Sequence, residues 1–580
     1  MCKRGIMMRN LMSHVRNYRI QVLGSVISLI IAAFCSLLQP WLLQDTLNCL
    51  MKNDAAGIKR YGIFLLLLAA IGVVCGILNI WFAAKTAQGV TSDVREQLYR
   101  KIQSFSFSNI EKFSVGTLIV RLINDMNQVT NIIMTTLMQV LRMPIILIGS
   151  FVMGIVTLPR YWWVQVLLLL IVSLVLFFVF PSLDKLFSKY QVWFDECNTV
   201  ARESMQGVRV VKSFNRQDQE TEKFTASSNE LNQLNIKIGY VFSILMPAFT
   251  LVVCIGTALI VYLVGKNIGL YPKDISAISS YVGYLSQMLS NLAFGGMMLA
   301  QYSRGLVSLK RIDEVIETEP DLKFNHEESN VDLKGSVEFD DVSFKYPGSS
   351  KETLSHVSFK VDPGETVGIV GRTGSGKSTL VSLLVRLYDP TSGTIRLGGC
   401  DLRDVNERKL RKMAALVQQK ALLFSGTIAD NLRQGDEDAT EEDMERAIEI
   451  SQAKEFIDKY PDRFEHVVEE RSANFSGGQQ QRLSIARGII GKPKVLILDD
   501  STSALDAESE KKVQAGLEQK LGDATVFIIA EKIFSVMHAD KILVMDDGKI
   551  KAMGTHEELL LTSPLYQEIY ETQRAREGGI

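Results

Sequence analysis

The residues most able to do chemistry lie in the glycine-rich segment Gly371–Ser378, whose sequence is GRTGSGKS. It follows the apolar stretch Thr366–Val370, which favours a buried strand, and it precedes TLVSLLVRLY, which favours an amphipathic helix. Glycines between a strand and a helix let backbone N–H groups approach an anion, and the helix N-terminus adds positive potential. The segment therefore predicts a phosphate-binding loop in which Lys377 reaches the outer phosphates and the Ser378 hydroxyl binds Mg²⁺.

Three later segments resemble motifs of the ATP-binding cassette (ABC) family. Asn474–Gln479 (NFSGGQ) resembles the ABC signature, Val495–Asp500 (VLILDD) resembles the Walker B strand, and Ser503–Asp506 resembles the D-loop. The signature is the most specific of the three, because it separates ABC proteins from other phosphate-loop ATPases. In that family the signature closes over ATP held by the opposite cassette. The residues implied to act in trans are Ser476, Gly477, Gly478 and Gln479.

The same resemblance implies this chain's own nucleotide site. Tyr346 stands where ABC proteins stack an aromatic ring on adenine, and Gln419 stands where they have the glutamine that senses the γ-phosphate and Mg²⁺. Because Gln418 is also a glutamine, we assign the role to Gln419 from its spacing to Leu423 and Phe424. The implied ATP-binding residues are Tyr346, Gly371, Arg372, Thr373, Gly374, Ser375, Gly376, Lys377, Ser378, Thr379 and Gln419. The implied Mg²⁺ ligands are Ser378, Gln419 and Asp499.

Two positions depart from the family pattern where hydrolysis takes place. Asp500 stands where the family usually has the catalytic Glu, and Glu531 stands in IIAEK where a His is usual. The shorter Asp draws its carboxylate back by about 1.5 Å, one C–C bond, and a misplacement on the order of 1 Å can cost ~100-fold in rate. A carboxylate at 531 has no proton to donate to the γ-phosphate at neutral pH. We therefore predict a site that binds MgATP and hydrolyses it poorly.

Composition and length indicate more than one domain. The chain has 580 residues, of which 47% are hydrophobic and 22% are charged, and its net charge of −1 gives no indication of nucleic-acid binding. The apolar residues are concentrated in the first 300 positions. Six stretches there are long enough to span a bilayer. They are about 20–44, 61–86, 138–158, 161–182, 238–264 and 275–300.

The basic residues set the expected topology of these spans. Lys and Arg are frequent in the N-terminal segment and in the long loops 87–137 and 183–237, whereas the other loops are short and hold few. The positive-inside rule then places the N-terminus, both long loops and the C-terminal domain in the cytoplasm of a plasma-membrane protein. Helical periodicity in the long loops predicts that the membrane helices continue into the cytoplasm. The sixth span is rich in Ser, and we expect it to face protein or a wet cavity.

The predicted fold is therefore a polytopic helical membrane domain of the ABC exporter type followed by an α/β phosphate-loop NTPase domain. We place the transmembrane domain at 1–320, a polar and acidic linker at 321–334, and the nucleotide-binding domain at 335–580. The pattern resembles a type IV ABC exporter half-transporter over essentially the whole chain. With Asp500 and Glu531, it is most similar to the degenerate-site subunit of bacterial heterodimeric multidrug exporters.

This resemblance implies a partner half-transporter that carries the intact Glu and His, with ATP and Mg²⁺ as cofactors. Arg142 and Lys237 could bind an anionic substrate group, but their positions near the inner boundary favour snorkelling to the interface. We therefore expect small hydrophobic or amphipathic substrates, such as drugs. Export of peptides or lipids remains the alternative within this class, and an ATP-binding regulator or channel remains an alternative outside it.

Overall fold

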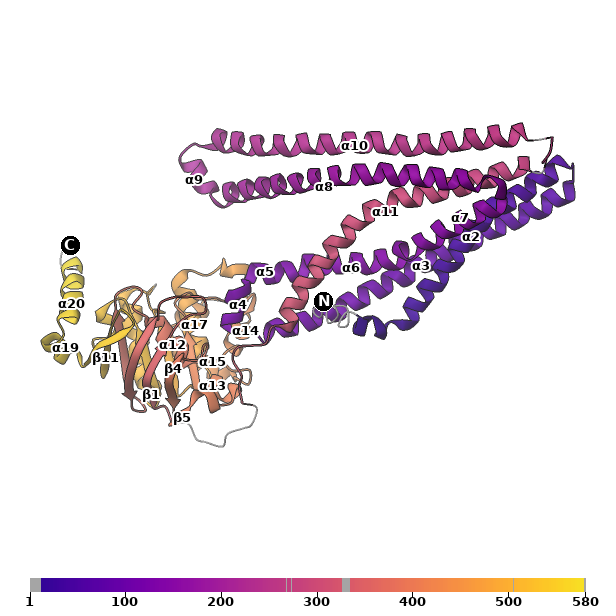
Figure 1. Cartoon of the computed structure of the whole chain (residues 1–580). Coiled ribbons are helices and arrows are strands. Elements are labelled where there is room, and N and C mark those ends of the chain that lie inside the picture. Colours follow the sequence, from indigo (N-terminus) through magenta and orange to yellow (C-terminus); the bar gives the residue numbers. More distant parts are fainter. Residues whose placement is uncertain (1–11, 268, 273, 326–333, 504, 578–580) are drawn as a thin grey trace. The chain divides into compact units, whose positions relative to one another are not determined.

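The structure is a computed structural model that describes residues 12–267, 269–272, 274–325, 334–503 and 505–577 (Figure 1). The chain divides into two compact units, which are treated separately below. The first comprises Met1–Gln103 and Val115–Thr318, and the second comprises Ser104–Ser114 and Glu319–Ile580. Much of the linker predicted at 321–334 lies outside the described residues, which leave out 326–333.

The first unit is built of long helices. Among the described residues, five helical segments are long and apolar enough to cross a membrane: Arg19–Met51, Ala55–Gln103, Val115–Thr157, Pro159–Gln206 and Gln217–Lys266. A sixth long helix, α11 (Asp274–Glu317), contains the last predicted span but does not reach the same hydropathy. Helices α3 (Ala55–Gln103), α8 (Trp162–Gln206) and α10 (Gln217–Lys266) extend well beyond their apolar parts, as the periodicity of the long loops predicted.

Several polar side chains of α11 face protein, as expected for the sixth span, whereas Ser286 and Ser290 are exposed. Ser280 donates to the Gln44 Oε1 atom at 2.6 Å, and the Gln287 amide donates to the Ser36 carbonyl at 3.1 Å. The Tyr284 hydroxyl is fully buried and donates to the Leu37 carbonyl of α2 (Arg19–Met51) at 2.8 Å. These hydrogen bonds satisfy groups that would be costly against lipid, so neighbouring helices stabilise α11.

Helices α8 and α10 run side by side and are joined by the short helix α9 (Val208–Ser213), at one end of the pair (Figure 1). Large apolar side chains of α8, of α9 and of the residue after α9 are exposed. They include Phe187, Val192, Met205, Val210 and Phe214. Helix α9 has no buried residue, so this end of the pair presents an apolar surface that the described part of its own chain leaves uncovered.

The second unit contains a six-stranded sheet in the order β12-β11-β3-β10-β9-β6. Its strands are β3 (Thr366–Gly371), β6 (Ala414–Val417), β9 (Val495–Asp499), β10 (Thr525–Ile529), β11 (Lys541–Asp546) and β12 (Lys549–Gly554). All neighbouring pairs are parallel except β11 with β12. The central strands are buried along their length, as parallel strands covered on both faces require.

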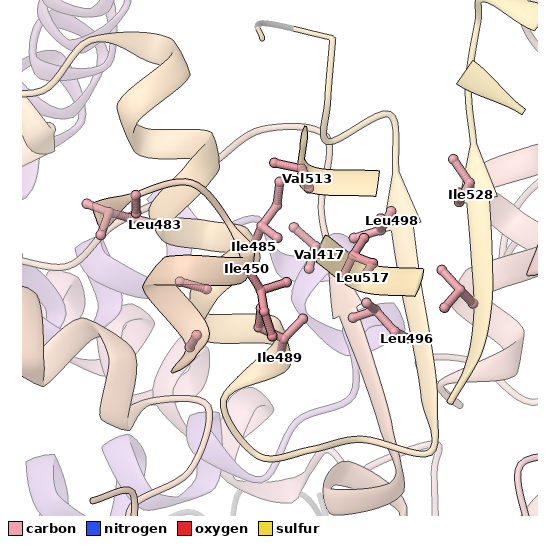
Figure 2. Packing of buried hydrophobic residues seen from close by; sticks show 14 of the residues in the cluster. Val417, Ile450, Leu483, Ile485, Ile489, Leu496, Leu498, Val513, Leu517 and Ile528 are labelled. Carbon is pink, nitrogen blue, oxygen red and sulfur yellow. The ribbon is translucent and has the colours of Figure 1, made fainter. Parts of the chain in front are cut away.

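The main core of this unit packs helices against one face of that sheet (Figure 2). Ile485 and Ile489 come from α17 (Gly477–Ile489), and Val513 and Leu517 come from α18 (Ala507–Lys520). They belong to one buried cluster with the strand residues Val417, Leu496 and Leu498. The apolar faces of the helices therefore pack on the apolar strands in one buried layer.

A second, four-stranded sheet has the order β2-β1-β4-β5. Its strands are β1 (Val337–Phe344), β2 (Leu354–Val361), β4 (Ser392–Leu397) and β5 (Cys400–Asp401). Strand β1 runs from Val337 to Phe344 without a break. Its register shifts between Phe339 and Val342, where Asp341 has a positive φ of 51°, and this irregularity interrupts the alternation of the sequence. Tyr346 follows the strand.

Residues 104–114 lie in the second unit although they interrupt the membrane segment in the sequence. Helix α4 (Phe107–Phe113) begins at a capping box on Ser106. The Glu111 carboxylate accepts a hydrogen bond from the Tyr388 hydroxyl at 2.8 Å. Burial raises the Tyr388 pKa, and this hydrogen bond raises it further. The Tyr388 side chain thus helps to hold residues 104–114 in the second unit.

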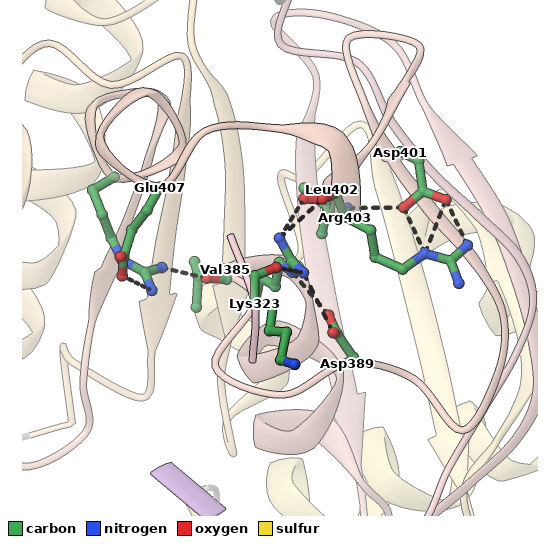
Figure 3. A network of polar contacts seen from close by, with 9 residues as sticks. Lys323, Val385, Asp389, Asp401, Leu402, Arg403 and Glu407 are labelled. Atoms are coloured by element: carbon green, nitrogen blue, oxygen red, sulfur yellow. Dashed lines mark hydrogen bonds and ion pairs between the residues drawn. The ribbon is translucent and has the colours of Figure 1, made fainter. Parts of the chain in front are cut away.

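A buried arginine joins the start of the second unit to its body (Figure 3). Arg386 is 2% exposed and forms an ion pair with Asp389 at 2.8 Å. It also donates to the carbonyls of Lys323 and Leu402, both at 3.1 Å, and its guanidinium lies 4.5 Å from the Phe324 ring centroid. A buried charge is tolerated because its donors are occupied in this way.

We predict that Arg386→Ala destabilises the second unit by about 3 kcal/mol, because it leaves buried carbonyl oxygens without donors. Arg403→Ala is the matched control, because Arg403 is 49% exposed and pairs with Asp401 at the surface. That change should cost under about 1 kcal/mol. Calorimetric unfolding of the full-length chain checks both values, and equal losses in the two variants would contradict the assigned role of Arg386.

Candidate nucleotide-binding site

The phosphate loop has the backbone that its glycines predict. It follows β3 and leads into α12 (Lys377–Leu384), whose N-cap residue Gly376 has a left-handed φ of 98°. A Cβ at Gly376 would lie 2.7 Å from the Leu354 side chain and 3.0 Å from the Thr353 carbonyl oxygen. Only glycine therefore fits here, and the first backbone N–H groups of α12 remain available to an anion.

A pocket of about 250 Å³ opens over this loop. Most of its lining residues come from the predicted site, and Thr353 and Ile529 are additions. The lining residues are Thr353, Thr373, Gly374, Gly376, Lys377, Ser378, Thr379, Gln419, Asp499, Asp500, Ile529 and Glu531. The folded chain therefore brings the phosphate loop together with both departures from the family pattern.

Lys377 is the cation of this pocket. Its ammonium donates to the Gly371 carbonyl at 2.9 Å and to the Arg372 carbonyl at 3.1 Å. Burial lowers the Lys377 pKa, while the negative charges of Glu531, Asp499 and Asp500 counteract that shift. The ammonium is thus folded back onto the loop, in position to exchange carbonyl oxygens for phosphate oxygens.

Ser378 and Asp499 form an oxygen pair suited to Mg²⁺. The Ser378 hydroxyl donates to the Asp499 Oδ1 atom at 3.1 Å. Burial raises the Asp499 pKa, and the neighbouring charge of Asp500 acts in the same direction. Hydroxyl and carboxylate oxygens are ligands that Mg²⁺ prefers, and it commonly completes its shell with water and nucleotide phosphates. The residues present therefore fit a nucleotide-bound Mg²⁺. The Gln419 side chain lines the same pocket, and its amide oxygen could serve as a further metal ligand.

Asp500 has its own fixed surroundings. Its Oδ2 atom accepts a hydrogen bond from the Gln419 Nε2 atom at 2.9 Å, and its N–H donates to the Ile529 carbonyl at 2.9 Å. Burial raises the Asp500 pKa, and the charge of Glu531 raises it further. The contact with Gln419 supports the choice of this residue over Gln418. Two carboxylates, at 500 and 531, thus line the same small pocket.

The remaining predicted ATP-binding residues lie around the pocket in different ways. The Tyr346 hydroxyl is 3.1 Å from the Thr379 hydroxyl, and its ring packs 5.3 Å from the Tyr388 ring. Arg372 turns outward to Glu568 at 3.0 Å. Ser375 is buried, and its hydroxyl has no partner in the described part of the chain. The Arg372 side chain therefore pairs with Glu568 and is not among the lining residues of the pocket.

The signature residues form the start of α17. The Ser476 side chain accepts from the Gln479 N–H, and the Gln479 side chain accepts from the Ser476 N–H at 2.8 Å, which completes a capping box. Ser476, Gly477, Gly478 and Gln479 are not among the lining residues of the pocket over this chain's phosphate loop. The N-terminus of α17 can therefore bind an anion that lies outside this chain's own nucleotide pocket.

Comparison with known proteins agrees with this geometry. Residues 22–289 match the model of the ABC transporter transmembrane region, and residues 354–503 match that of the ABC transporter. An uncharacterized ABC transporter ATP-binding protein of Bacillus subtilis is 34% identical over 99% of this chain and 100% of its own length. An ATP-dependent lipid A-core flippase of Vibrio vulnificus is 31% identical over 97% of both chains.

The fold is also similar to that of a bacterial Atm1-family ABC exporter with ATP bound. The TM-score is 0.79 over 96% of this chain and 98% of that chain, at 23% sequence identity. The order of the two matched regions is the order of the two structural units. The chain therefore belongs to the ABC transporter family, as a half-transporter in which one transmembrane region precedes one ABC domain in the fold of an exporter.

Proposed function

We propose that this chain is one subunit of a heterodimeric, ATP-driven exporter. In this proposal it binds MgATP at a hydrolysis-impaired site and lends its signature to the competent site of a partner half-transporter. The observation that carries the proposal is the pair of carboxylates, Asp500 and Glu531, that line one pocket with Lys377 and Ser378. The residues that hold phosphate and metal are intact, whereas those that activate water are altered.

The local contacts support impaired hydrolysis. One Asp500 oxygen accepts a hydrogen bond from Gln419, so the short carboxylate is held toward that side of the pocket and has less freedom to reach a water. The Glu531 carboxylate offers no proton to a γ-phosphate and repels it instead. When bound, Mg²⁺ would neutralise phosphate charge. The chain's own residues then bind and orient the nucleotide through Lys377, Ser378 and the amides of α12.

A partner with an intact site follows from this chemistry, because a homodimer of this chain would hold two impaired sites. The uncovered apolar surface near α9 supports the presence of a second subunit. The signature, which lies away from this chain's own pocket, supports action on the nucleotide of that subunit. We place the assembly in the plasma membrane, with the N-terminus and the ABC domain in the cytoplasm.

The proposed substrates are hydrophobic or amphipathic compounds, with drugs as the leading class. Lipid export is the second candidate, and the similarity to lipid A-core flippases favours it. Substrate-stimulated ATPase of the copurified pair in lipid nanodiscs separates these classes. Stimulation by amphipathic drugs supports the first class, stimulation by lipids supports the second, and stimulation by neither points to a nucleotide-binding regulator or channel.

Expressed without a partner, the full-length chain should bind MgATP and show little ATPase activity, because Lys377 and Ser378 still hold phosphate and metal while Asp500 and Glu531 impair the chemistry. Coexpression with its competent partner should give steady turnover. Equilibrium binding of a fluorescent ATP analogue and phosphate release measure the two properties on one sample. Lys377→Ala is the control that removes the main phosphate cation. Rapid hydrolysis by the purified chain alone would refute the degenerate-site assignment.

In the heterodimer, Gly477→Asp should lower turnover by about 100-fold or more, because a negative charge replaces an anion-binding helix start over the partner's ATP. A Cβ at Gly477 meets no atom within 4 Å, so the cassette itself should fold normally. Asp500→Asn should cause a smaller loss, since it alters a site that already turns over slowly. Steady-state ATPase ranks the two variants, and the opposite order would reverse the assignment of sites.

A further inference from the structure

We infer that Gln573, on the C-terminal helix α20 (Pro564–Glu577), is a positioning residue for the segment Ile528–Lys532, here called the switch segment, which carries Glu531. No sequence motif indicated this residue. The inference deepens the proposed function and rests on it in one respect, namely that residue 531 faces the γ-phosphate of bound ATP.

The Gln573 amide makes two hydrogen bonds to the backbone, one within the switch segment and one to the residue just after it. Its Nε2 atom donates to the Glu531 carbonyl at 2.7 Å, and its Oε1 atom accepts from the Ile533 N–H at 2.8 Å. One planar amide thus satisfies a carbonyl and an N–H two residues apart, as a neighbouring strand would. This pair of bonds fixes the backbone on both sides of Lys532.

Helix α20 is itself anchored to the body of the unit, so it can hold the switch segment in place. Tyr566 is fully buried, and its hydroxyl lies 2.7 Å from the His556 Nδ1 atom. The Tyr570 ring is 6.1 Å from the ring of Phe534, in the turn Ile533–Ser535 that follows the switch. Ring packing and hydrogen bonds therefore both hold α20 against residues 531–534.

The same helix also reaches the phosphate loop. Glu568 and Arg372 form an ion pair at 3.0 Å, with side chains that are 61% and 60% exposed. An exposed pair of this kind contributes little free energy. It does show that α20 lies against both the loop that precedes Lys377 and the segment that carries Glu531. These two segments line the nucleotide pocket from different strands.

The consequence concerns how the pocket distinguishes ATP from ADP. A side chain at 531 affects the γ-phosphate only if its backbone is held against the pocket, and Gln573 holds that backbone. A protein in which Gln573 were merely structural would bind ATP and ADP more weakly to the same extent. A positioning role instead changes the ratio of the two affinities.

The test is a double-mutant cycle in the full-length chain in lipid nanodiscs, with dissociation constants measured for MgATP and MgADP. Glu531→His should raise the preference for ATP over ADP by about tenfold, since it removes a like charge and adds a donor. Adding Gln573→Ala should return the preference to within about threefold of the wild type. Gln567→Ala is the matched control, because Gln567 donates to the Leu560 carbonyl of α19 (His556–Thr562), away from the switch. An undiminished gain in the Gln573→Ala background would overturn the inference.

Hydrogen exchange at the Ile533 amide gives a second readout that needs no nucleotide. Gln573→Ala should speed this exchange at least about fivefold, the factor expected for one lost hydrogen bond. Gln573→Glu should have a smaller effect, because a carboxylate still accepts from Ile533 but cannot donate to the Glu531 carbonyl. Unchanged exchange in Gln573→Ala would overturn the inference. A failure of Glu531→His alone, with faster exchange in Gln573→Ala, would instead refute the role of residue 531 at the γ-phosphate and leave the positioning role supported.

Discussion

The site depends on the parallel pairing of β3, β10 and β9, which brings three chain segments to one edge of the sheet. Ile369 pairs with Ile529, and Ile529 pairs with Asp499, so these strands end almost level. The residues just beyond those ends are the phosphate loop, Asp500 and the switch segment. In parallel sheets, loops at the carboxyl ends of the strands form the binding crevice. The register alone therefore places Lys377 against three carboxylates from two other strands.

Several features of the molecule follow directly from local sequence. The glycines of the phosphate loop need left-handed backbone, as at Gly376, and this requirement is visible without a structure. The strands Thr366–Gly371 and Val495–Asp499 are continuous apolar runs, and the membrane helices are long apolar stretches. Each of these signals arises within a few turns or one strand of the chain, where periodicity and backbone preference are strong.

Other features depend on contacts between residues far apart in the sequence. Gln419 and Asp500 are 81 positions apart, and only the fold shows that their side chains are hydrogen-bonded. Gln573 is 42 positions from Glu531 and belongs to a helix without a motif. Residues 104–114 pack with the second unit through Glu111 and Tyr388, which are 277 positions apart. Such pairs follow from tertiary packing, which no local pattern encodes.

The charges of the pocket limit what it can do without a partner. Asp499, Asp500 and Glu531 line the same pocket as one partly buried lysine whose pKa is lowered by burial, so a bound Mg²⁺ would supply much of the positive charge that ATP requires. Under the proposed function, the carboxylate at 531 faces the γ-phosphate, and the repulsion between the two weakens ATP binding to the open cassette. Under the proposed function, tight retention of ATP here therefore comes from the closed dimer. The partner's signature then supplies the missing donors, and ATP stabilises closure only to the extent that it binds that state better.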